Sequence, residues 1–176
     1  NAFYSCKKLE KISLPESLVS LGSYAFLDCP RLVSVDIPES TKNIGSFVFR
    51  GCLSLESVKI PSSLTEIPIG MFDSCVSMTK IVLPSKVTKI SQYAFNYCSK
   101  LTDINIPETL TTVDSYAFRS CAALKSIRLD NVSSLGTFVF QGCVSLESVA
   151  LPLISDIPAF TFSECMMLGK VEFAKN

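Results

Sequence analysis

Eight cysteines are the residues of this 176-residue chain whose type and spacing first suggest chemistry. A thiol can pair in a disulfide, bind a metal ion or pack as a small apolar side chain. Successive cysteines lie 23 residues apart five times and then 22 residues apart twice. A fixed period of this length indicates stacked supersecondary units. The eight cysteines are Cys6, Cys29, Cys52, Cys75, Cys98, Cys121, Cys143 and Cys165.

Packing is the role we favour for this cysteine column. Phenylalanine stands three residues before every cysteine, and the same apolar pattern includes alanine, as in Ala25, Phe26 and Cys29. Parallel Cβ vectors in stacked units disfavour a disulfide. A linear ladder without histidine or a CxxC pair cannot supply four converging zinc ligands. We therefore expect eight reduced, buried and metal-free thiols, almost none of which a thiol reagent labels before unfolding, and no cofactor.

A short strand is expected shortly after each cysteine. Aliphatic residues stand three, six and eight residues after it, as in Leu9, Ile12 and Leu14. The last two alternate with period two, which predicts a half-buried strand, and a following proline such as Pro15 would end it. Strands that are each reached by one full turn of chain run parallel. The pattern predicts an α/β repeat with a parallel sheet of about eight short strands.

The second half of each unit predicts a further short extended segment and then helical turns. Apolar residues eight, four and three residues before the cysteine follow helical spacing, and serines stand at the N-cap position. In the shorter units the missing residue falls after the strand, where a turn tolerates deletion. There Asp130, Asn131 and Val132 replace the proline turn. The N-cap candidates are Ser23, Ser46 and Ser115.

Composition excludes several classes of function. The 16 basic and 16 acidic residues leave no electrostatic footprint for nucleic acid, and no apolar run reaches the roughly 20 residues of a membrane span. There is no histidine, no G-x-S-x-G turn and no phosphate-binding glycine loop, so we expect no catalytic residue and no enzyme.

Residues 1–176 start and stop inside a unit. We expect one solenoid domain of eight units within a longer chain, with further repeats at both ends.

The repeat unit resembles a known family. Leu9, Ile12 and Leu14 match the L-x-x-L-x-L core of leucine-rich repeats. In most units proline follows the strand, and a pattern close to I-G-x-x-A-F-x-x-C comes next, as in residues 21–29 and 44–52; the likeness covers the whole chain. This unit resembles the BspA-like (Treponema pallidum-type) leucine-rich repeat. The resemblance implies a right-handed solenoid and a secreted or cell-surface adhesin that binds host or matrix proteins.

A candidate partner-binding surface is the exposed face of the strands, which we expect to be concave. Charges alternate along it, no aromatic side chain appears, and only Arg128 is of a type common in binding hot spots. A solvated face without a ligand is the alternative. The central and contiguous candidates are Lys59, Lys80, Asp103, Asn105 and Arg128.

A second candidate surface is an aromatic row five residues before the cysteines. Rings in such a row can form an adhesive patch or can lie over the neighbouring unit as part of the packing. The row consists of Tyr24, Phe47, Tyr93, Tyr116, Phe138 and Phe160.

For the chain as a whole we expect protein binding. A passive spacer that presents another domain is the alternative, and an enzyme would need its catalytic residues elsewhere in the protein.

Overall fold

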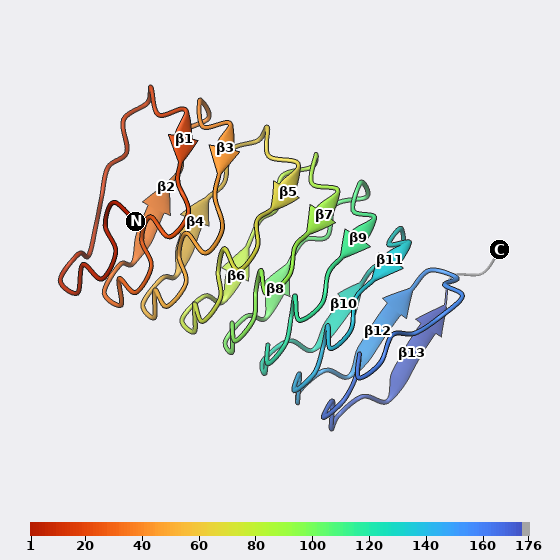
Figure 1. Ribbon diagram of the computed structural model, residues 1–176. Coiled ribbons are helices and arrows are strands. Elements are labelled where there is room, and N and C mark those ends of the chain that lie inside the picture. Colours follow the sequence, from red (N-terminus) through yellow and green to blue (C-terminus); the bar gives the residue numbers. More distant parts are fainter. Residues whose placement is uncertain (174–176) are drawn as a thin grey trace.

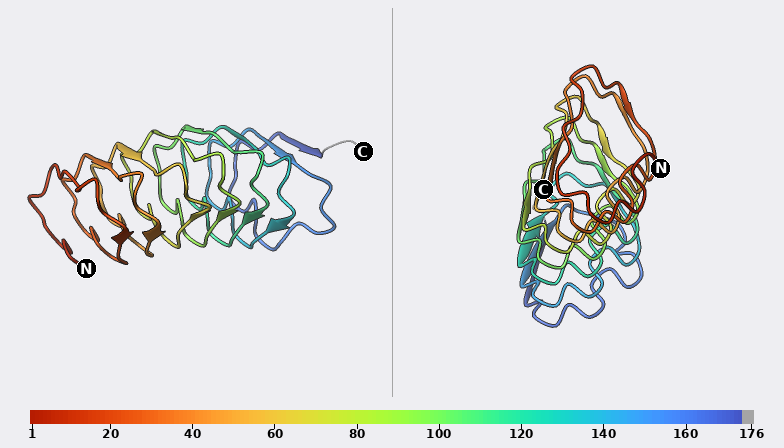
Figure 2. Two further views of the ribbon diagram at one scale, coloured as in Figure 1. Left: turned by 90° about the horizontal axis from the view of Figure 1, so that it is seen from above. Right: turned by 90° about the vertical axis from the view of Figure 1, so that its left-hand side faces the viewer.

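The structure, a computed structural model, describes residues 1–173, so the last three residues of the predicted domain lie outside it. The chain winds into a stack of similar turns with the described termini at opposite ends of the stack (Figures 1 and 2). Each turn between Cys29 and Cys143 contributes one short strand to each of two ladders. Within the described residues, no helix is long and apolar enough to cross a membrane.

The first ladder follows the cysteines and confirms that the predicted strands run parallel, but it has seven strands in three separate groups and not one sheet of about eight. Lys11 forms a parallel bridge with Ser34 at its start, and equivalent residues of successive turns face one another. Hydrogen bonding joins β2 to β4, β6 to β8, and β10 to β12 and β13, with interruptions between these groups. The strands are β2 (Ser34–Asp36), β4 (Ser57–Lys59), β6 (Lys80–Ile81), β8 (Asp103–Ile104), β10 (Ser126–Arg128), β12 (Ser148–Leu151) and β13 (Lys170–Phe173).

The second ladder confirms the further extended segment expected after the proline. It forms a separate row of shorter strands in Figure 1. β1 pairs with β3, and β5, β7, β9 and β11 form a continuous parallel group. Its strands are β1 (Ser20–Leu21), β3 (Asn43–Ile44), β5 (Glu66–Ile67), β7 (Lys89–Ile90), β9 (Thr112–Val113) and β11 (Ser134–Leu135).

The expected helical turns before the cysteines are wrong, because no helix occurs in residues 1–173. Tyr24 and Asp28 have φ values of +58° and +56°, which a right-handed helix excludes. The Phe26 N–H donates across to the Val48 carbonyl of the next turn at 2.9 Å, not four residues back along the chain. The apolar spacing therefore reflects consecutive tight turns whose hydrogen bonds run between units.

The predicted N-caps are wrong for the same reason, since there is no helix to cap. Ser23 Oγ instead accepts the N–H of Ser46 at 3.1 Å, and Ser115 Oγ accepts the N–H of Thr137 at 3.1 Å. These hydroxyl groups connect equivalent positions of adjacent turns. They therefore stabilise the stack and not a single segment.

The core is a set of apolar columns that run the length of the stack. The rings three residues before the cysteines stack face to face in sequence, with centroid distances from 5.1 to 5.8 Å. The interior rings are fully buried. They are Phe26, Phe49, Phe72, Phe95, Phe118 and Phe140.

Candidate binding surface

The cysteine column lies in this core and its thiols are free. Each cysteine from the second turn onward donates its S–H to the phenylalanine carbonyl of the preceding turn, at 3.0 to 3.2 Å. Six cysteines are buried as expected, whereas Cys6 and Cys165 in the end turns are only partly buried, so full burial of all eight is wrong. An end turn has a neighbour on one side only, which explains the difference.

Burial keeps the interior thiols protonated. It raises the pKa of Cys52 and of Cys143 to about 12, and that of Cys165 to about 11. Burial also raises the pKa of Cys75 well above the ordinary value for a thiol. Because the thiolate is the reactive form and the metal ligand, the six buried thiols of the column are chemically inert at neutral pH. In residues 1–173 no cluster of three or more His, Cys, Asp or Glu residues could hold a metal ion.

The five partner-binding candidates lie on the exposed side of the first ladder. Lys59 ends β4, Lys80 begins β6, Asp103 begins β8, Asn105 follows β8 and Arg128 ends β10. All five are exposed, and alternation along each strand directs the residues between them into the core. The structure thus places the five on one exposed face across four neighbouring turns, in two adjacent columns that are together called the row here.

Most of these candidates already have partners within the chain. Lys80 Nζ lies 2.7 Å from Asp103 Oδ2. Arg128 donates to both carboxylate oxygens of Asp130, from Nε at 3.1 Å and from Nη2 at 2.9 Å. Such exposed pairs contribute about 0 to 1 kcal/mol each, so they fix side-chain orientation more than they stabilise the fold.

Two candidates differ from those ion pairs. Asn105 donates Nδ2 to the Leu83 carbonyl at 3.0 Å and accepts the Leu83 N–H at 2.6 Å, so its amide continues the ladder beyond β8. Lys59 has no ion pair within the described residues. The pKa of Glu39 is lowered mainly by hydrogen bonds from Ser62, and the Lys59 charge contributes less. Lys59 is therefore the cation of the row most available to a partner.

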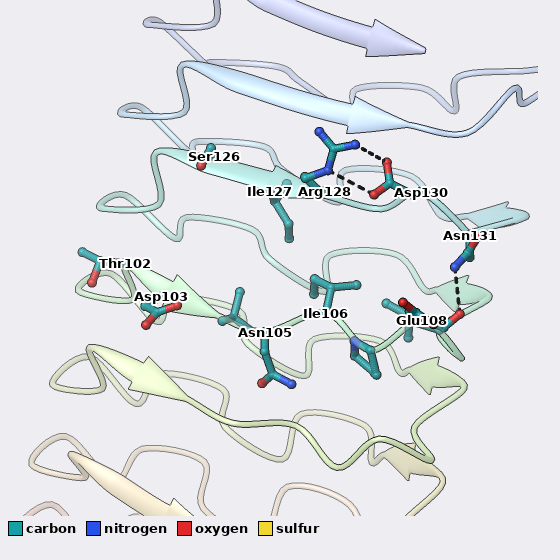
Figure 3. Close-up of a pocket in the computed structure, with 13 residues that line it drawn as sticks. Thr102, Asp103, Asn105, Ile106, Glu108, Ser126, Ile127, Arg128, Asp130 and Asn131 are labelled. Carbon is teal, nitrogen blue, oxygen red and sulfur yellow. Dashed lines mark hydrogen bonds and ion pairs between the residues drawn. The ribbon is translucent and has the colours of Figure 1, made fainter. Parts of the chain in front are cut away.

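A hollow of about 520 Å³ opens in this surface between β8 and β10. Figure 3 shows Asp103 and Asn105 on one side, and Arg128 with its partner Asp130 on the other. Asp130 occupies the position that is proline in most units. The replacement predicted a shorter turn from the sequence, and a hollow at this place was not predicted.

A partly buried polar cluster two residues before the cysteines was not predicted from the sequence; within it Asp73 and Asn96 are buried and Arg50 is exposed. Arg50 Nε lies 3.1 Å from Asp73 Oδ2, and Asn96 donates Nδ2 to Asp73 Oδ1 at 2.9 Å. Asn96 Oδ1 and Arg119 Nε are buried without a partner in the described chain. Burial raises the pKa of Asp73, against the opposing effects of Asn96 and Arg50. The position varies from turn to turn, so no repeated pattern marks it.

The aromatic row stacks along the solenoid in two runs. Tyr24 stacks on Phe47 at 5.5 Å, and a longer run of four rings has centroid distances of 4.7 to 4.9 Å. Between the runs stands Gly70, whose Cβ position would lie 2.2 Å from the Phe47 ring. Each ring thus packs on its neighbour, and only Tyr24 and Phe160, at one end of each run, are exposed. The longer run is Tyr93, Tyr116, Phe138 and Phe160.

The repeat geometry agrees with a sequence family. The model of the BspA type leucine rich repeat region matches residues 1–124 and 65–176, which together span the chain. The chain belongs to the BspA-type leucine-rich repeat family. The crystal structure of the Treponema pallidum leucine-rich repeat protein is similar to this BspA-type chain, with 35% identity and a TM-score of 0.78 over 85% of this chain and 71% of that chain. The resemblance inferred from the sequence is confirmed.

Two further solved structures share the BspA-type fold. A Bacteroides ovatus leucine-rich repeat protein is 25% identical with a TM-score of 0.72, and a leucine rich cell surface protein of Faecalibacterium prausnitzii is 24% identical with a TM-score of 0.68. The matches cover 98% and 97% of this chain, but only 57% and 55% of those chains. Among curated proteins, none matches the chain.

Proposed function

We propose that this BspA-type chain is a non-catalytic protein-binding module that acts at the cell surface or after secretion and adheres to host or matrix protein. The observation that carries the proposal is the exposed row of Lys59, Lys80, Asp103, Asn105 and Arg128, which the first ladder holds in fixed register. Solenoids use such extended surfaces for binding. The name of the Faecalibacterium relative supports the location.

A direct test replaces the four charged residues of the row by alanine and measures capture of purified extracellular-matrix proteins on a sensor surface. Asn105 is kept, because its amide bonds the Leu83 backbone. We expect at least a tenfold loss of affinity, because these four side chains supply contacts and are too exposed to support the core. Thermal unfolding should be unchanged. A matched control replaces the exposed residues Lys8, Lys42, Lys86 and Asp156, which removes the same net charge outside the row.

A passive spacer is the second candidate function, and the internal ion pairs favour it. Lys80 with Asp103 and Arg128 with Asp130 satisfy one another without any partner. A spacer would lose no capture in the row variant. Equal capture by the row variant and the control variant would therefore reject the binding module and support the spacer.

A further inference from the structure

The first ladder is open between β8 and β10. In neighbouring turns the residue four after the cysteine donates its N–H to the equivalent carbonyl of the turn before, as Thr102 does to Thr79 at 2.9 Å and Glu147 to Lys125 at 2.8 Å. The equivalent bond from Lys125 to Thr102 is absent in residues 1–173. Carbonyl and amide groups at this join are thus left to solvent or to a ligand.

The open join uncovers part of the core. Ile104 and Ile106 are partly exposed, whereas the equivalent side chains in the turns before and after are at most 4% exposed. Both isoleucines line the hollow of about 520 Å³ described above. The hollow therefore has an aliphatic floor, which favours an apolar or aliphatic group of a ligand. The buried equivalents are Ile81, Leu83, Ile127 and Leu129.

The rim of the hollow has more free acceptors than free donors. Three carboxylates line it, those of Asp103, Glu108 and Asp130, against one guanidinium, that of Arg128. Arg128 is already committed to Asp130, with Glu172 3.9 Å away, and Asp103 pairs with Lys80. The Glu108 carboxylate has no partner among residues 1–173.

The amide side chains at the rim do not change this balance. Asn131 donates Nδ2 to the Glu108 carbonyl at 2.9 Å, on the same side of the hollow as Asp130 in Figure 3. Asn105 uses both its amide atoms on Leu83. The remaining charge at the rim is therefore negative, and its unused groups accept hydrogen bonds.

We propose that this hollow receives a lysine or arginine side chain of a protein partner. The aliphatic stem lies on Ile104 and Ile106, and the cationic head donates to Glu108 and to the outer oxygen lone pairs of Asp130. A long basic side chain fits both parts of the site, since its stem is apolar and its head is a multiple donor. The inference rests on the proposed protein-binding function and names the chemistry of the partner.

The test uses N-acetyl-arginine methylamide as the probe and amide NMR shifts of the full 176-residue chain at low ionic strength. We expect saturable shifts confined to residues 102–110 and 126–131. The citrulline counterpart has a similar shape without the charge, and it should bind at least fivefold more weakly. Glu108→Gln should weaken arginine binding at least threefold, whereas Glu56→Gln, the same charge change at an exposed site outside the hollow, should not.

Three results would overturn the inference: equal shifts with citrulline, shifts spread over the whole surface, or unchanged binding by Glu108→Gln with an unchanged unfolding temperature. The outcomes distinguish a failure of the proposed basic side-chain site from a failure of the proposed protein-binding function. Loss of matrix capture in the row variant with no probe binding rejects the hollow alone. Probe binding with unchanged capture rejects the protein-binding function and, with it, a protein partner for the hollow.

Discussion

At the scale of single residues, the cysteine column serves packing and hydrogen bonding. Every thiol after the first has a carbonyl acceptor in the preceding turn, so the interior cysteines are satisfied polar groups within an apolar core. The sequence predicted this role because the cysteines keep step with phenylalanine. It did not predict that the end thiols are partly exposed, since the repeat pattern is the same in every turn.

Thiol labelling tests this residue-scale account. In the folded chain at pH 7, N-ethylmaleimide should modify Cys6 within an hour and Cys165 more slowly, because both are partly exposed but burial raises the pKa of Cys165 to about 11. The other six thiols are buried and should stay unmodified. Peptide mass spectrometry identifies the modified residues. Labelling in denaturant provides the control and should modify all eight. Rapid modification of Cys75 or Cys98 in the folded chain would contradict the account.

The buried carboxylate of Asp73 gives a pH dependence. Folding raises the pKa of Asp73, so the folded state favours the protonated acid. The resulting contribution to the free energy of unfolding is fully present below the pKa of the unfolded chain, about 3.9, and is lost as the pH rises through the raised pKa of the folded chain. Asp73→Asn should therefore show a smaller loss of unfolding free energy between pH 4 and pH 7 than the unchanged chain. Urea unfolding at several pH values measures it. The opposite slope would mean that Arg50 and Asn96 outweigh burial.

At the scale of elements, tight turns with positive φ replace the expected helical turns. Aromatic residues seldom adopt positive φ, so positions such as Tyr93 and Tyr116 gave no sign of a left-handed turn. Apolar spacing alone cannot distinguish a helix from a turn whose hydrogen bonds run to the next unit. The strands, in contrast, were predictable because alternation and a following proline mark them in most units.

A pair of glycine substitutions tests the turn geometry. Gly70→Ala should destabilise the chain by roughly 1 to 3 kcal/mol, since Gly70 has φ of +56° and its Cβ would meet the Phe47 ring. Gly22→Ala is the matched control, because its Cβ meets nothing within 4 Å. Its effect should stay within about 0.5 kcal/mol. Denaturant midpoints compare the two, and equal effects would refute the steric argument.

At the scale of the whole molecule, stability comes from contacts between neighbouring turns. The first ladder is interrupted between β4 and β6 and between β8 and β10, while the Phe column continues across both joins. The repeat period predicted the stack, but it could not reveal the interruptions because all turns share the same apolar columns. The one available signal was Asp130 at a proline position.

Hydrogen exchange tests the open join. The Lys125 amide should exchange at least tenfold faster than the Glu147 amide, because Glu147 donates to the preceding turn and Lys125 does not. Amide NMR measures both rates in one experiment. The Thr102 amide is a second protected reference. Equal protection of Lys125 and Glu147 would show that the ladder is closed in solution.

The candidate surface was predictable only in part. Repeat register placed Lys59, Lys80, Asp103, Asn105 and Arg128 on one face, and the structure places them there. Their internal partners and the hollow depend on contacts between turns, which a single repeat does not encode.

The most direct measurement of the central claim is the dissociation constant of a matrix protein for three chains: the unchanged chain, the alanine variant of the four charged row residues, and the charge-matched control variant. The account predicts at least tenfold weaker binding by the row variant and unchanged binding by the control, with the same unfolding temperature for all three. Equal dissociation constants for the row variant and the control would contradict it.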